Sequence, residues 1–113
     1  MIQTGLIIDT SVLSAAYSAG DVFLSTALYD NLPNMLIESC CCGTPCVAVD
    51  TGGVKDILSY GANGIATAPE KEKLAAAVQF IFDHSAKFSP SAEVFDISTS
   101  AKKYSDLYAG IIN

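Results

Sequence analysis

Two carboxylates beside a predicted helix start are the residues of this sequence best suited to chemistry. Asp30 precedes the helix and Glu38 falls in its second turn, with Asn34 on the same helical face four residues earlier. The first backbone N–H groups of a helix lack intrahelical partners, so they favour an anion such as phosphate. A nearby carboxylate accepts hydrogen bonds from a diol. Together these features predict a nucleotide-sugar site.

The helix that positions these groups has clear start and stop signals. Pro33 suits the first helical position, where no N–H is needed, and Asn31 is expected to cap that end from just outside. Gly43 is expected to end the helix in the left-handed conformation. A separate apolar face is expected to pack on a sheet; it consists of Leu36, Ile37, Cys40 and Cys41.

A short apolar run and a glycine turn follow the helix. Residues 46–49 are too few for a helix and are typical of a strand covered on both faces. The chain then turns at Gly52 and Gly53, where that strand ends. Because open α/β sheets bind ligands at the carboxyl ends of their strands, the two glycines form a candidate substrate loop. The alternative is an ordinary turn.

The rest of the chain alternates predicted strands with predicted helices. This alternation indicates an α/β domain with a parallel sheet and right-handed crossovers. A dinucleotide-binding redox domain is disfavoured, since no G-x-G-x-x-G follows the first strand. The expected strands cover residues 2–8, 22–24, 46–49 and 65–67, with helices near 10–19, 33–42, 54–59, 70–84 and from 97 onward, and a turn over 61–64.

The four cysteines, at positions 40, 41, 42 and 46, allow three interpretations. A zinc site needs ligands that converge, and three successive helical residues point in different directions. Disulfides belong mainly to oxidising compartments. The sequence therefore favours small apolar core residues in a reducing compartment, and no metal site is expected.

The charge and hydropathy of the chain limit its partners. A net charge of −6 and a pI near 4.4 argue against nucleic acid and anionic lipid, which need basic patches. No apolar run approaches the ~18 residues of a membrane span, and residues 1–3 carry no basic signal region. We therefore expect a cytoplasmic protein with no nucleic-acid partner and no direct membrane span.

Taken together, these motifs resemble the C-terminal part of the retaining glycosyltransferases with the GT-B fold, group 1 or family 4. The likeness covers nearly all 113 residues and implies a partial Rossmann-like parallel sheet flanked by helices. The matching pieces are YSAGDVF at 17–23, NLPN at 31–34, CGTP at 42–45 and TGG at 51–53, with Asp30 and Glu38 at the family's paired acids.

The resemblance also implies roles for the site residues. Asp30 would be the catalytic-site acid that holds hydroxyl groups of the donor sugar, and Glu38 would accept hydrogen bonds from the ribose of a nucleoside-diphosphate sugar. No metal and no cofactor is implied. Without the resemblance, Asp30 is simply a loop or capping residue and Glu38 a solvated helix residue. The implied backbone donors are Asn31 and Leu32 toward the donor sugar, and Asn34 and Met35 toward the diphosphate.

Several departures from the family pattern set further expectations. Asp30 stands where Glu is usual, and its side chain is one methylene shorter. Residues 26–27 are Thr-Ala instead of Pro-Ser. Residues 55–56 are Lys-Asp instead of Pro-Glu. The acceptor domain is expected to be absent, as is the segment that supplies an Arg and a Lys to the diphosphate. We therefore expect residues 1–113 to form a single partial nucleotide-sugar-binding domain, inactive as an isolated fragment. The alternative is a non-catalytic truncated module that binds nucleotide weakly or mediates association.

The first expected strand would lack its usual neighbours in this arrangement. Residues 2–8 are then expected either to pair beside residues 22–24 or to join another chain. Unpaired strand edges and exposed apolar surface promote association. The sequence therefore predicts self-association through exposed sheet edges.

Overall fold

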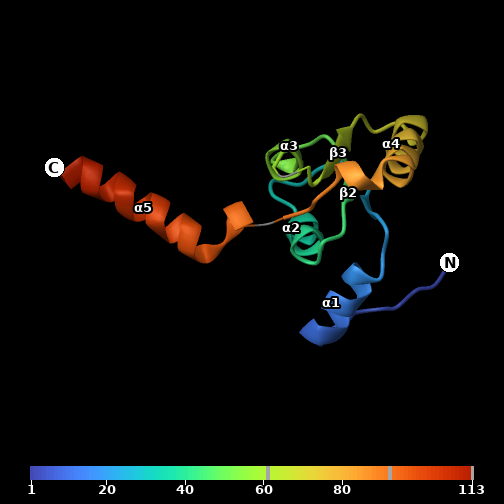
Figure 1. Cartoon of the computed structure of the whole chain (residues 1–113), viewed down its shortest axis with the longest axis horizontal. Helices are drawn as coiled ribbons and strands as arrows, with labels where there is room; N and C mark the ends of the chain where they lie inside the picture. Colours follow the sequence, from blue (N-terminus) through green and yellow to red (C-terminus); the bar gives the residue numbers. More distant parts are fainter. Residues whose placement is uncertain (61, 92, 113) are drawn as a thin grey trace.

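The computed structural model of the chain contains a small parallel sheet surrounded by helices (Figure 1). It describes residues 1–60, 62–91 and 93–112. The strands β1 (Phe23–Ser25), β2 (Cys46–Val49) and β3 (Gly64–Thr67) are parallel and lie in the order β1-β2-β3. The predicted fold class is confirmed. The turn expected over 61–64 includes Gly61, which lies outside the described residues.

Helices cover both faces of the sheet. The helices α2 (Asn34–Cys41) and α3 (Val54–Leu58) pack on one face, and α4 (Lys71–Asp83) packs on the other. A fourth helix, α1 (Thr10–Ser18), leads into β1. Asp9 caps it, because the Asp9 side chain accepts hydrogen bonds from the backbone N–H groups of Ser11 and Val12. A hydrogen bond from the Ser11 hydroxyl, together with these two backbone bonds, lowers the pKa of Asp9.

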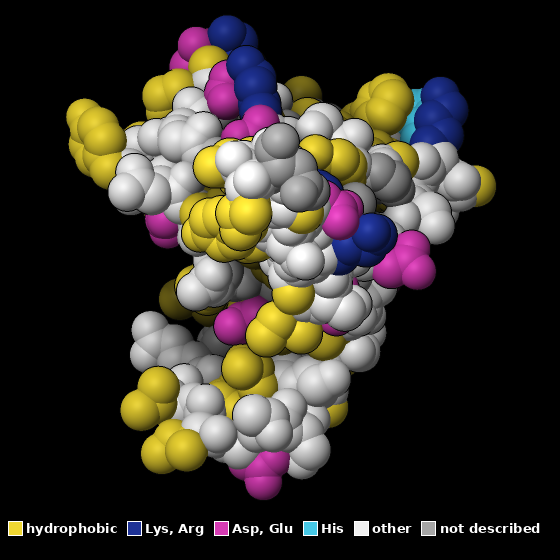
Figure 2. Space-filling model, turned by 90° about the vertical axis from the view of Figure 1, so that its left-hand side faces the viewer, with side chains coloured by type: hydrophobic (Ala, Val, Ile, Leu, Met, Phe, Trp, Pro, Cys, Tyr) yellow, Lys and Arg dark blue, Asp and Glu magenta, His cyan; other side chains and the backbone are white. Residues whose placement is uncertain are grey.

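The C-terminal helix α5 (Ile97–Ile112) extends away from this body, as Figure 1 shows. Two short 3₁₀ turns, η1 (Ser85–Lys87) and η2 (Glu93–Phe95), lead toward it. Of the α5 residues that the structure describes, none is buried. Figure 2, seen from the α5 side, shows many apolar side chains at the surface. The helix predicted from residue 97 onward is confirmed, and its apolar residues Tyr104, Leu107, Tyr108 and Ile111 are all exposed.

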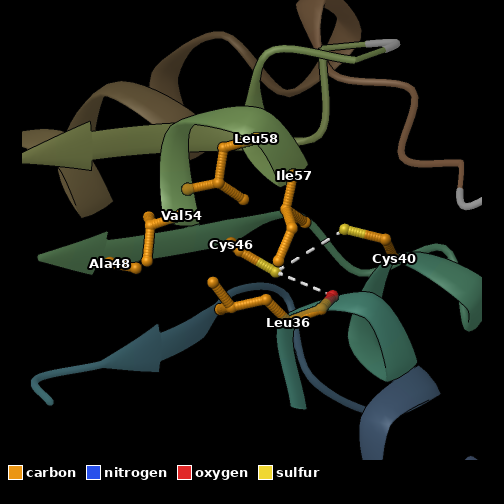
Figure 3. Close-up of a cluster of buried hydrophobic side chains, with 7 residues drawn as sticks. All are labelled: Leu36, Cys40, Cys46, Ala48, Val54, Ile57 and Leu58. Atoms are coloured by element: carbon orange, nitrogen blue, oxygen red, sulfur yellow. Dashed lines mark hydrogen bonds between the residues drawn. The ribbon is translucent and has the colours of Figure 1, made fainter. Parts of the chain in front are cut away.

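The core lies between β2 and the two helices on its first face (Figure 3). The sulfur atoms of Cys40 and Cys46 are 3.9 Å apart inside this cluster, and both are free thiols. The contact with Cys46 and burial raise the pKa of the Cys40 thiol. Cys41 is exposed, so the prediction that it belongs to the apolar face is wrong. It is adjacent to the buried Cys40, and neighbouring helical residues point in different directions.

The expected strand over residues 2–8 does not form. Residues 1–9 have neither helix nor strand, and the Ile2 and Leu6 side chains are 92% and 89% exposed. Gly5 has φ +67°, a left-handed conformation that interrupts an extended run. A strand also needs a hydrogen-bonded neighbour, and the described sheet consists of β1, β2 and β3 without any residue of this segment. The expected pairing beside β1 is therefore wrong.

The start of α2 also differs from the prediction. The helix begins at Asn34, Pro33 is its N-cap, and no side chain caps it. The predicted cap by Asn31 is therefore wrong. Asn31 is engaged through its backbone instead, because its carbonyl accepts a hydrogen bond from the N–H of Gly53.

Candidate functional site

Two loops meet at the carboxyl edge of the sheet. β1 leads into the loop that carries Asp30, and β2 leads into the turn at Gly52 and Gly53. β1 and β2 are adjacent and parallel, so both loops leave the sheet at the same edge. The Gly53 N–H donates to the Asn31 carbonyl oxygen at 2.6 Å. The structure thus brings together the first predicted acid and the predicted glycine loop, which are separated by more than 20 residues in the sequence.

The two glycines are required by this contact. Gly52 has φ +49°, and a Cβ atom there would collide with the Asp30 carbonyl oxygen. A Cβ atom at Gly53 would lie 2.8 Å from the Asn31 carbonyl oxygen and 2.9 Å from Leu32 Cδ1. The close approach of the protein's own backbone therefore accounts for both glycines. A direct contact of this turn with substrate stays a prediction.

The start of α2 presents the remaining predicted residues. Asp30 is exposed, and within the described residues its carboxylate has neither a hydrogen-bond nor an ion-pair partner. Asn34 and Met35 form the first turn of α2, where backbone N–H groups are available to an anion. The Met35 side chain borders a hollow between α1 and α2. These residues are accessible, as a binding site requires.

Glu38 lies in the second turn of α2 and has a partner that the sequence analysis missed. The hydroxyl of Tyr17, in the last turn of α1, donates to Glu38 Oε2 at 2.9 Å. Burial, this hydrogen bond and the Glu38 charge raise the pKa of Tyr17 to about 12. In the sequence, Tyr17 was noted only as the first residue of the matching piece YSAGDVF at 17–23. The hydroxyl group of this tyrosine is the feature of the sequence that could have indicated a hydrogen bond to a polar partner.

Tyr17 is held at two further points. Its backbone carbonyl accepts a hydrogen bond from Thr44 Oγ1 at 2.7 Å, and its ring lies edge-on to Phe23 with centroids 5.5 Å apart. Thr44 is buried, and its own carbonyl accepts from the Ser39 hydroxyl at 3.0 Å. These contacts join α1 to α2 and to β1 around Glu38.

Two mainly apolar hollows flank Tyr17 and share Leu13. One has a volume of about 260 Å³ and extends to Phe23 and Met35; the other has a volume of about 290 Å³ and extends to Glu38.

Asp50 and Lys55 form an ion pair at the end of β2. Within the described residues, no group of three or more His, Cys, Asp or Glu side chains is arranged to hold a metal ion. The helices described include none that is both long and apolar enough to cross a membrane.

The sheet and the loops at its carboxyl edge identify the type of domain. A parallel sheet with a helix start and an acid-bearing loop at its carboxyl edge is a Rossmann-like domain of the GT-B type. The sequence profile of the family Glycosyl transferases group 1 matches residues 2–84, and the chain belongs to this family. The resemblance to group 1 glycosyltransferases that was inferred from the motifs is confirmed.

A solved structure supports the same assignment. Sucrose-phosphate synthase from Thermosynechococcus elongatus is 25% identical to the chain, with a TM-score of 0.72. The alignment covers 93% of this chain and 29% of the synthase, so the chain spans less than a third of that enzyme's length. A search of curated proteins gives no significant match.

Proposed function

We propose that this chain is the donor-binding portion of a glycosyltransferase that transfers a sugar from a nucleoside-diphosphate sugar to an acceptor with retention. The observation that carries the proposal is the meeting of two loops at the carboxyl edge of the sheet. There the 2.6 Å hydrogen bond between Gly53 and Asn31 holds the Asp30 loop beside the glycine turn. Membership of the group 1 family supports the same activity.

The proposed roles follow from the chemistry of each group. Asp30 holds hydroxyl groups of the donor sugar, helped by the Asn31 and Leu32 amides. The N–H groups at the start of α2 face the diphosphate, where the leaving group develops negative charge and fixed dipoles are most effective. Glu38 accepts hydrogen bonds from the ribose hydroxyl groups. No resident metal or other cofactor is assigned.

We propose further that residues 1–113 form a single partial domain without transfer activity of their own. The chain spans 29% of the synthase it resembles, and an acceptor site is needed to position the second substrate. The net charge of −6 also opposes tight binding of an anionic nucleotide, and the Lys55 ammonium group is already paired with Asp50. Weak nucleotide binding and no sugar transfer are the expected properties of the isolated chain.

Titration calorimetry with UDP and GDP tests the site. A hydrogen bond to a charged group contributes about 1.5–3 kcal/mol, so Glu38→Ala should weaken binding roughly tenfold or more. Glu72→Ala, in the exposed first turn of α4, is the matched control and should bind like the native chain. Equal affinities of all three proteins would remove Glu38 from the site.

A transfer assay with several nucleotide sugars tests the proposed inactivity. The native chain should neither hydrolyse the donors nor transfer their sugars. Robust turnover would show that residues 1–113 already contain an acceptor site and would overturn the fragment interpretation.

A non-catalytic role in association is the second candidate. β1 and β3 each pair on one side within the described sheet, and the side chain of Leu24 is exposed on β1. Unpaired edges can add a strand from another chain. Light scattering over a concentration series tests this self-association, and a monomer at every concentration would exclude it. The cytoplasmic location stays a prediction.

A further inference from the structure

We propose that Tyr17 is a positioning residue of the donor site, which holds the Glu38 carboxylate in the orientation that accepts hydrogen bonds from ribose. This inference rests on the proposed function, since it assigns a helper to one of its residues. It adds α1 to a site otherwise built from the loops and helix after β1 and β2.

The hydrogen bond between the two side chains leaves capacity for a ligand. Tyr17 donates to Glu38 Oε2 at 2.9 Å, while Oε1 accepts no hydrogen bond within the described residues. A carboxylate has about four acceptor positions, so it can bind the tyrosine and two ribose hydroxyl groups together. The tyrosine therefore does not need to leave when the nucleotide binds.

Tyr17 is more firmly held than the side chain it supports. Its ring packs edge-on against Phe23, and its carbonyl is fixed by the buried Thr44. Glu38 is exposed, and a free glutamate of this kind samples many rotamers. Fixing the carboxylate before the ligand arrives lowers the entropy lost on binding.

The contacts around Tyr17 form a closed path back to Glu38. Ser39 Oγ donates to the Thr44 carbonyl, Thr44 Oγ1 donates to the Tyr17 carbonyl, and the Tyr17 hydroxyl donates to Glu38. Ser39 is the residue next to Glu38 in α2. The hydroxyl is the one member of this path that reaches the proposed site, so its removal should affect ligand binding more than folding.

A double-mutant cycle distinguishes positioning from a purely structural link. Tyr17→Phe keeps the ring against Phe23 and removes only the hydroxyl. It should weaken UDP or GDP binding roughly three- to tenfold, and the same substitution in a Glu38→Ala chain should have no further effect. Tyr104→Phe, on the exposed α5, is the matched control and should leave the affinity unchanged. Circular dichroism confirms that each variant is folded.

Two outcomes would overturn the inference, and they differ from failure of the proposed function. Native binding with an equal loss from Tyr17→Phe in both backgrounds would mean that the tyrosine acts independently of Glu38. Native binding that Tyr17→Phe leaves unchanged would reduce the bond to a structural link. If the native chain binds neither nucleotide, the proposed function fails and the inference falls with it.

An absorbance titration of the tyrosines examines the hydrogen bond without any ligand. Comparison with Tyr17→Phe identifies the Tyr17 ionisation, which Glu38→Gln should move to lower pH. An ionisation unaffected by Glu38→Gln would mean that the two side chains do not interact in solution, and the inference would be wrong whatever the binding results.

Discussion

β2 and α5 are both rich in apolar residues, yet their surroundings are opposite. Every residue of Cys46–Val49 is buried, whereas no described residue of Ile97–Ile112 is. β2 lies between two strands and between helices on both faces, while α5 extends from the body and contacts η2. Apolar content therefore predicts that an element forms, but burial depends on what lies beside it.

Substitutions of one large apolar residue in each region should give the largest contrast. Ile57 is fully buried against β2, so Ile57→Ala should lower the free energy of unfolding by about 2–5 kcal/mol. Ile111→Ala, on the exposed α5, should change it by about 0.5 kcal/mol or less. Urea denaturation measures both. Comparable losses would mean that α5 is covered in solution.

The loop contact at the edge of the sheet can be tested by comparing two left-handed glycines. Gly43, with φ +79°, has open space around it, while Gly52 abuts the Asp30 carbonyl. Both alanine variants share the backbone cost of the left-handed conformation, about 1–2 kcal/mol. Gly52→Ala should cost about 1–3 kcal/mol more because of the added collision. Urea denaturation that shows equal losses would mean that the Asp30 loop moves freely away from the turn.

The buried amide of Asn63 links the sheet to the segment that leads toward α5. Its Nδ2 donates to the Ile57 carbonyl at 2.9 Å, and its Oδ1 accepts from the Ser91 N–H at 2.7 Å. Asn63→Ala leaves both partners unsatisfied and should cost about 1–3 kcal/mol. Gln79→Ala, on the exposed face of α4, is the control and should cost far less. Thermal unfolding compares them, and a small effect at Asn63 would indicate that water replaces the amide.

The smallest expected effect concerns pH and the α1–α2 link. The pKa of Tyr17 is raised to about 12 in the folded chain, against about 10 when unfolded. The folded state therefore holds this proton more strongly, so its contribution to stability is present below pH ~10 and is lost as pH rises toward about 12. Denaturation midpoints should fall more steeply over this range for the native chain than for Tyr17→Phe. Parallel curves would contradict the raised pKa.

Elements whose signals are local could be predicted from the sequence. The extent of β2 and the left-handed Gly43 after α2 are found as predicted. Each depends on a short run of residue types and on backbone preferences within a few positions. The combined motifs likewise identified the family, and the helix pattern placed Asp30 before α2 and Glu38 in its second turn.

Features that depend on residues distant in sequence could not be predicted in this way, because they arise from the packing of the elements. Residues 2–8 have strand-like composition but no neighbouring strand, so they stay unpaired. Asn31 is engaged by the backbone of Gly53 instead of capping α2. The partnership of Tyr17 with Glu38 spans 21 positions and arises because α1 and α2 pack together. Local propensity cannot reveal such contacts, since their geometry is set by how the elements pack and not by the order of residues within any one of them.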